Sequence, residues 1–163
     1  MWTETAEGRA YVEEVSRCVV DEVAPEELDL FGDLMAEYFA DPTPPAAGDV
    51  QRDDALGFGL GEALIAVTPA AAAMVTAVLA HVLAEAGDAL KEESGNRVKD
   101  AIKRLFNPEK EEAEKRPRPQ PLSTDQMKQV RRIARREAIK FGLDPDVASK
   151  MATALIGALA LAA

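Results

Sequence analysis

The chain contains 163 residues, of which 47% are hydrophobic and 29% are charged, and its formal net charge is −10. This composition supports a folded core and excludes wholesale disorder. Aromatic residues make up only 5%, which favours closely packed helices over a β-sandwich. The chain has one cysteine, Cys18, and one histidine, His81. These counts exclude a disulfide framework, a cysteine-based zinc site and a site with two or three histidines within one chain.

Two proline-rich stretches divide the chain. Residues 41–54 and 107–122 hold seven of the ten prolines and are predicted to be linkers, the second extended and solvated. The blocks between them are an acidic block (1–40), an apolar block (55–106) and a basic and apolar block (123–163). We predict an all-α fold with helical hairpins around a long central helix and proline-rich linkers between the blocks.

In the first block, apolar residues recur every three or four positions on both sides of a break at Ala24-Pro25. This pattern predicts two helices in an antiparallel hairpin, with their stripes buried together and the Cys18 thiol inert in the core. Glu26 and Glu27 are expected to favour the dipole of the second helix. The two stripes consist of Tyr11, Val15, Cys18, Val19 and Val23, and of Leu28, Phe31, Leu34, Met35, Tyr38 and Phe39.

The second block predicts one long helix. Thr68 is placed to cap a helix that starts at Pro69, and apolar residues keep a helical period as far as Phe106. Unbroken, this helix would be roughly 57 Å long at 1.5 Å per residue. Gly87 and Gly95 are the positions where a kink is plausible.

The third block predicts a helical hairpin with a tight turn. Ser123 and Gln126 form a capping box, Gly142 suits the position after the first helix, and Asp144-Pro145 begins the second. Apolar residues cover more than one face of the second helix, so we expect it to dock onto the central helix or another subunit. The predicted assembly residues are Met151, Leu155, Ile156 and Leu159.

A segment from Leu56 to Phe106 opens with glycines, passes through Val67-Thr68-Pro69 into an alanine- and valine-rich helix and ends in Lys/Arg-Leu-Phe. Together with the hairpin from Ser123 to Ala163, it resembles small uncharacterised alanine-rich helical proteins of high-GC actinobacteria. The resemblance covers about two thirds of the chain. It implies no particular activity.

Charge is unevenly distributed, because residues 1–54 carry a net −12 and residues 123–163 a net +3. The acidic and basic parts are expected to attract each other or a neighbouring copy, or simply to be solvated. Six basic residues lie opposite the apolar stripe of one predicted helix and form a candidate contact for a protein partner or an anionic membrane surface. They are Lys128, Arg131, Arg132, Arg135, Arg136 and Lys140.

Nucleic acid is a disfavoured partner for this basic helix. The helix that follows it carries only Asp146 and Lys150 as charged residues and so does not suit a recognition helix, and the whole chain is acidic. The sequence also has no Ser/His/Asp set, phosphate-binding loop or metal cluster, and His81 is expected to be a packed histidine. We therefore predict a protein that is not an enzyme and has no cofactor, catalytic residue or metal site.

The leading functional hypothesis is a non-enzymatic helical interaction or assembly protein that forms a homo-oligomer or docks a protein partner. The alternative is a membrane-perturbing effector whose segment 55–90 inserts after a trigger. Its basis is the uncharged run from Ala63 to Ala80, preceded by Gly57, Gly59 and Gly61. The start of the chain, Met1-Trp2-Thr3-Glu4, lacks the features of a signal peptide and predicts a cytoplasmic location, with membrane association only on activation.

Overall fold

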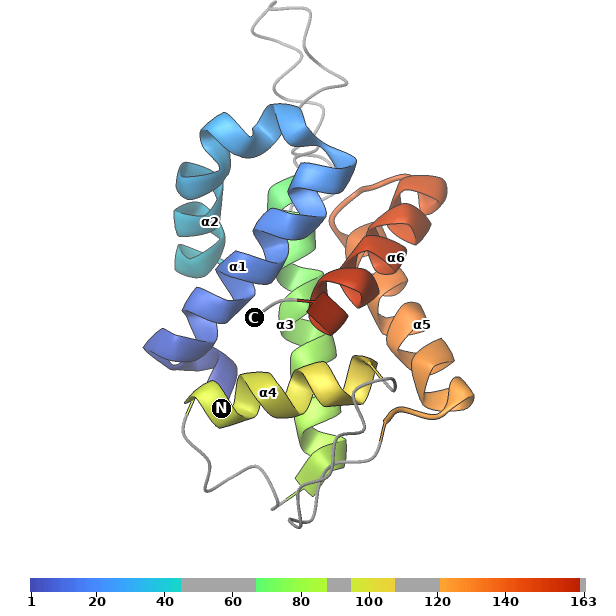
Figure 1. The fold of residues 1–163 in the computed structure, drawn as a ribbon. Coiled ribbons are helices and arrows are strands. Elements are labelled where there is room, and N and C mark those ends of the chain that lie inside the picture. The colour runs from blue at the N-terminus through green and yellow to red at the C-terminus, as the bar shows by residue number, and fades with distance from the viewer. Residues whose placement is uncertain (45–66, 88–94, 108–120, 162–163) are drawn as a thin grey trace, which may run out of the picture.

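The structure is a computed structural model that describes residues 1–44, 67–87, 95–107 and 121–161 (Figure 1). All regular structure in these ranges is helical, which confirms the predicted all-α class. Two 3₁₀ helices, η1 (Trp2–Glu4) and η2 (Pro25–Leu30), accompany the α-helices. The α-helices are α1 (Ala6–Val23), α2 (Phe31–Ala40), α3 (Val67–Ala86), α4 (Gly95–Phe106), α5 (Thr124–Lys140) and α6 (Pro145–Leu161). The predicted glycine-rich opening and most of both predicted linkers lie outside the described residues.

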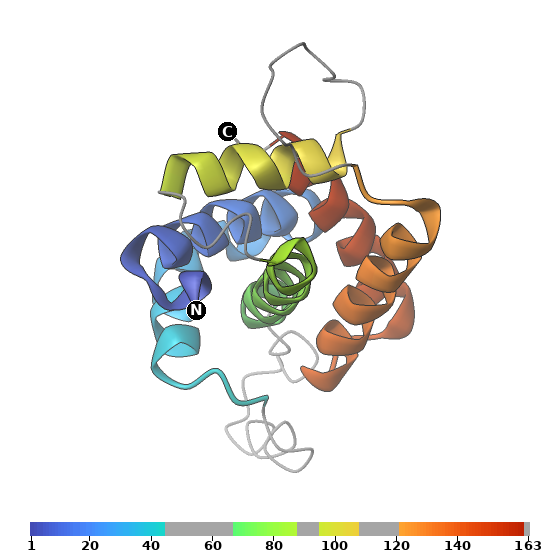
Figure 2. The same ribbon diagram turned by 90° about the horizontal axis from the view of Figure 1, so that it is seen from below.

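Helix α3 runs through the middle of the fold, as the view along it in Figure 2 shows. It packs against α1, α2 and α5. A helix that is apolar nearly all round must be covered on several sides, and these neighbours supply the cover. The buried residues of α3 are Val67, Thr68, Ala70, Ala71, Ala72, Ala73, Met74, Val75, Val78, Leu79 and Val82.

The long helix predicted from Pro69 to Phe106 is two separate helices, and they end and begin at the two glycines, Gly87 and Gly95, where the sequence makes a kink plausible. Helix α3 ends at Ala86, and Gly87 has a φ of +64°, a left-handed conformation that glycine adopts without strain. Helix α4 then packs across α6 and α1. A straight continuation would leave the apolar stripe of α4 in water, whereas the observed packing buries Val98, Ala101, Ile102, Leu105 and Phe106.

Helices α1 and α2 run antiparallel, as predicted, but their apolar stripes are not buried mainly against each other. The extensive contacts of α1 are with α3 and α6, and those of α2 are with α3. Between α1 and α2, the guanidinium of Arg9 lies 5.6 Å from the centre of the Phe39 ring, and that of Arg17 lies 4.4 Å from Phe31. The two helices therefore contact each other through cation–π pairs, and both also pack against α3.

The predicted core position of Cys18 is also wrong. Its side chain is exposed, whereas Val12, Ser16 and Val20 are buried. Because α1 is covered by both α3 and α6, its buried face is wider than one stripe and is rotated away from Cys18.

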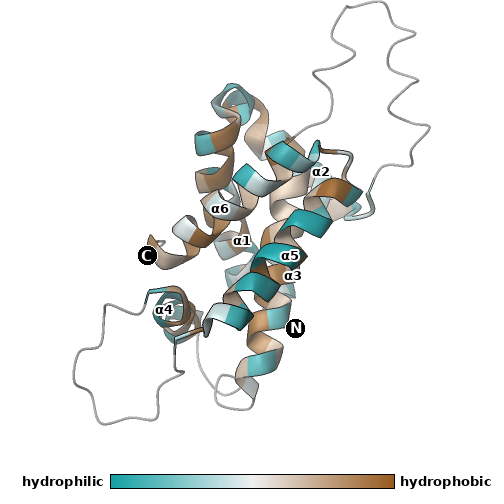
Figure 3. Ribbon diagram, turned by 90° about the vertical axis from the view of Figure 1, so that its right-hand side faces the viewer, coloured by the Kyte–Doolittle hydropathy of each residue, from teal (hydrophilic) through white to brown (hydrophobic). Residues whose placement is uncertain are grey.

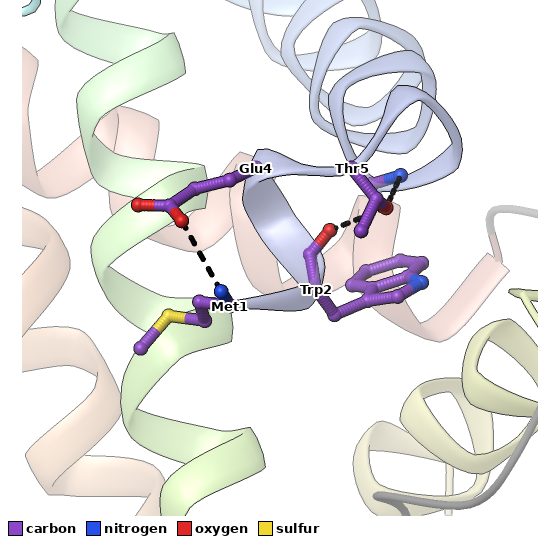
Figure 4. A network of polar contacts seen from close by, with 5 residues as sticks. Met1, Trp2, Glu4 and Thr5 are labelled. Atoms are coloured by element: carbon purple, nitrogen blue, oxygen red, sulfur yellow. Dashed lines mark hydrogen bonds and ion pairs between the residues drawn. The ribbon is translucent and has the colours of Figure 1, made fainter.

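The start of the chain is folded against α1 (Figure 4). Thr5 caps α1: its Oγ1 accepts from the Gly8 amide at 3.1 Å and donates to the Trp2 carbonyl at 2.6 Å. The Met1 ammonium lies 3.1 Å from Glu4 Oε2. A Cβ atom on Gly8 would lie 2.0 Å from the Trp2 carbonyl oxygen, so only glycine fits where η1 crosses α1.

The predicted hairpin of α5 and α6 is confirmed. Ser123 Oγ accepts from the Gln126 amide at 3.2 Å, and Gln126 Oε1 accepts from the Ser123 amide at 2.8 Å, which is the predicted capping box. Gly142 follows α5 with a φ of +89°, and Asp144 Oδ1 accepts from the Asp146 amide at the start of α6. These local signals define both ends of the turn.

Candidate functional site

The six predicted basic side chains are all exposed on α5. Figure 3 shows this helix with a largely hydrophilic outer side. Its opposite side packs on α3 and α6 through Val130, Ile133, Ala134 and Ala138. Four of the basic residues follow one another at four-residue steps, and we call them the basic row: Lys128, Arg132, Arg136 and Lys140.

The other two basic residues of α5, Arg131 and Arg135, form hydrogen bonds with side chains of α6. Arg131 Nη1 donates to Thr153 Oγ1 and Arg135 Nε donates to Ser149 Oγ, each at 3.1 Å. Both hydroxyls also donate to α6 carbonyls four residues earlier. The two arginines therefore tie α5 to α6, although their charge still contributes to the surface.

The polar partners of the basic row come from α5 itself. Lys140 Nζ lies 2.9 Å and Arg136 Nε lies 3.8 Å from Glu137 Oε1, and Arg132 donates to the side chain of Gln129. Lys128 is 4.0 Å from Asp125. Since α5 carries six basic and two acidic residues, it keeps a net positive charge that these local pairs do not neutralise.

The residues predicted as an assembly surface on α6 point into the fold. Met151, Leu155 and Leu159 are fully buried, and Ile156 is partly buried. They contribute to the core that α6 shares with α1, α4 and α5. The surface that α6 does expose carries Thr153, Gly157 and Leu161, the last 78% exposed.

Sequence reasoning missed the role of Glu27. Its carboxylate accepts from the amides of Val67 and Thr68 at 2.7 and 2.8 Å and from the Thr68 hydroxyl at 2.7 Å. Thr68 was expected to cap α3, but its hydroxyl donates to Glu27 and the carboxylate serves the helix amides. A separation of 40 residues between Glu27 and Val67 gives no local pattern from which this contact could be predicted.

Tyr11, Cys18 and His81 are side chains with possible reactivity. Burial raises the pKa of the Tyr11 phenol. Partial desolvation and the nearby Glu14 and Asp21 carboxylates raise the pKa of the Cys18 thiol on the surface of α1, so both groups resist ionisation. His81 Nε2 lies 3.5 Å from Glu85 Oε1 on the partly exposed side of α3. Across the described parts of the chain, no three His, Cys, Asp or Glu side chains are grouped to hold a metal ion.

Helix α3 is long and apolar enough, by length and composition, to cross a membrane. Most of it is buried inside the fold, and the core helix of a water-soluble protein passes the same test. The part of the predicted insertion segment that precedes Val67 lies outside the described residues.

Comparison of the chain with protein-family models, curated proteins and solved structures finds no match. The resemblance to actinobacterial helical proteins therefore stays a prediction.

Proposed function

We propose that this chain is a non-enzymatic interaction protein that binds an acidic protein surface through the basic row of α5. The single observation that carries the proposal is the exposed row itself, whose local partners leave α5 with a net positive charge. The side chains are displayed on a helix that is capped at its start and packed on α3 and α6. Such a rigid display favours electrostatic recognition of a partner.

An acidic protein suits this surface better than a nucleic acid does. The whole chain has a formal net charge of −10, and residues 1–44 contain twelve acidic and two basic residues. A polyphosphate would meet this repulsion at any distance within the Debye length, about 10 Å at 0.1 M salt. A folded acidic partner can place its carboxylates on the basic row and keep the rest of its surface away.

The expected binding is weak and sensitive to salt. Exposed ion pairs contribute about 0.2–1 kcal/mol each, so four such pairs would mainly set association rate and orientation. The expected dissociation constant for a short acidic probe is therefore in the micromolar range or weaker.

Fluorescence anisotropy with a labelled helical glutamate-rich peptide tests this function. The double substitution Arg132→Gln and Arg136→Gln should weaken binding about tenfold, which corresponds to about 1.4 kcal/mol. The matched control is Lys150→Gln, which removes an exposed cation of α6 outside the row and should leave the affinity within about twofold. Equal affinity of the wild type and the double variant, or tighter binding of single-stranded DNA of the same length, would contradict the proposal.

A second candidate function is the membrane-perturbing effector, supported by the apolar character of α3 and by the Glu27 carboxylate at its N-terminus. Release of that contact would free the start of the helix. Dye leakage from vesicles of phosphatidylcholine and phosphatidylglycerol in equal parts tests this idea. Faster leakage with Glu27→Ala than with Glu26→Ala would support it, and no leakage with either variant would reject it.

A further inference from the structure

A second surface of the chain is complementary in charge and spacing to the basic row. Four acidic residues of η2, α2 and the position after α2 also follow one another at four-residue steps, and we call them the acidic row: Asp29, Asp33, Glu37 and Asp41. All four are exposed. No ion pair joins them to a cation within the described residues, and the polar partner of Asp41 is the Thr43 amide.

The side of α2 that carries the acidic row has only small residues beside its charged side chains. Gly32, Ala36 and Ala40 are exposed beside the acidic residues, and a Cβ built on Gly32 would have no atom within 4 Å. Small residues leave room for the long arginine and lysine side chains of an approaching helix. The other side of α2 is anchored in the core by Phe31, Met35 and Tyr38.

We infer that the acidic partner of α5 is a second copy of this chain, with the basic row of one copy crossing the acidic row of the other. This inference rests on the proposed function and names its partner. Within α5 and α2, successive charges of a row are about 6 Å apart, because four residues of an α-helix rise by that distance, and in the acidic row this applies to Asp33 and Glu37. Two helices that meet along such four-residue rows cross at about −50°. A crossing at this angle brings the middle residues of the rows together, Arg132 and Arg136 with Asp33 and Glu37.

The two rows face away from each other, because each lies on the side of its helix opposite the buried residues, and only the buried sides of α2 and α5 approach one another (Figure 1). The Tyr38 ring of α2 is 6.3 Å from the Phe141 ring at the end of α5, measured between ring centres. Each row can therefore meet a different copy, so that the contact repeats head to tail and the smallest complex is a dimer. One such contact contributes little against the free energy cost of association, so the expected self-association is weak.

The test is sedimentation velocity of the full chain at moderate and high salt. At about 0.1 M salt, where a Debye length of about 10 Å limits the repulsion between two chains of net charge −10 but leaves close ion pairs attractive, the wild type should form dimers and larger species. At about 1 M salt, where the Debye length is about 3 Å, it should be monomeric. Two charge-reversed variants should each be monomeric at about 0.1 M salt. The first carries Arg132→Glu and Arg136→Glu, and the second carries Asp33→Arg and Glu37→Arg.

An equimolar mixture of the two variants decides whether the rows bind each other. In the mixture, the unaltered acidic row of the first variant meets the unaltered basic row of the second, and the two reversed rows also match, so dimers should return. The control pair, Lys150→Glu and Glu22→Arg, reverses exposed charges outside both rows and should dimerise like the wild type. Circular dichroism melting of each variant shows whether it is folded.

A mixture that stays monomeric while both variants are folded would overturn the inference. So would a wild type that stays monomeric at about 0.1 M salt. If that wild type still binds the glutamate-rich peptide through Arg132 and Arg136, the proposed function stands and only the self-association fails. If it binds neither, both proposals fail.

Discussion

Helices α3 and α5 have similar lengths, 20 and 17 residues, but depend on the rest of the chain in opposite ways. Helix α5 supplies its own cap from Ser123 and Gln126 and exposes one charged face. Helix α3 is apolar nearly all round and takes the carboxylate at its N-terminus from Glu27. The comparison teaches that α5 is specified by neighbours in sequence and α3 by neighbours in space.

The largest expected difference between the two helices concerns their apolar side chains. Leu79 of α3 is fully buried, and Leu79→Ala should lower the free energy of unfolding by about 2–5 kcal/mol because it leaves a cavity. Ile139 of α5 is 39% exposed, and Ile139→Ala should change that free energy by about 0.5 kcal/mol or less. Urea denaturation measures the free energy of unfolding of both variants. Similar decreases for the two would contradict the difference between α3 and α5.

The next largest effect on stability is expected at Glu27, whose carboxylate accepts hydrogen bonds from the first amides of α3. Glu27→Ala removes the acceptor of three hydrogen bonds, two of them from Thr68, which is fully buried. We expect the free energy of unfolding to fall by about 1–3 kcal/mol, because the three donors are left without this acceptor. The control is Glu26→Ala, an exposed neighbour, which should change stability by about 0.5 kcal/mol or less. A neutral Glu27→Ala in urea denaturation would show that α3 does not need this contact.

Removing the N-terminal cap of α5 should lower the free energy of unfolding by less than removing the Glu27 carboxylate does. Ser123→Ala removes the acceptor for the Gln126 amide, for which the expected loss is about 1 kcal/mol. Hydrogen exchange at the first amides of α5 should accelerate while the amides of α3 stay protected, since the cap is local. Equal acceleration in both helices would mean that α5 is not independently specified.

The smallest effect at neutral pH is expected at Tyr11 of α1, whose hydroxyl is buried without a hydrogen-bond partner in the described structure. Tyr11→Phe should therefore leave stability at pH 7 unchanged or raise it by up to about 1 kcal/mol. Folding raises the pKa of Tyr11 above its ordinary value of 10.0 through burial. Above pH 10 the phenol ionises first in the unfolded chain, so the wild type should lose stability as the pH rises, and Tyr11→Phe should lose less. Urea denaturation of both proteins between pH 7 and about pH 11 measures the difference, and parallel curves would contradict it.

The sequence alone determined the helical class, the limits of the α5–α6 hairpin and the exposed basic face of α5. These features depend on contacts between residues close in the chain, such as the reciprocal hydrogen bonds of Ser123 and Gln126 and the positive φ of Gly142. A stripe of charges opposite a stripe of apolar residues is likewise a property of one helix.

Only the tertiary structure decided how the apolar surface is shared. In the tertiary structure, α4 packs on α6 and does not continue α3. Cys18 is exposed, and Met151 and Leu155 are buried against neighbouring helices. The tertiary structure also brought Glu27 to Val67 across 40 residues. Periodicity shows that a helix has an apolar face but not which helix will cover it, because burial is non-directional and any apolar neighbour satisfies it.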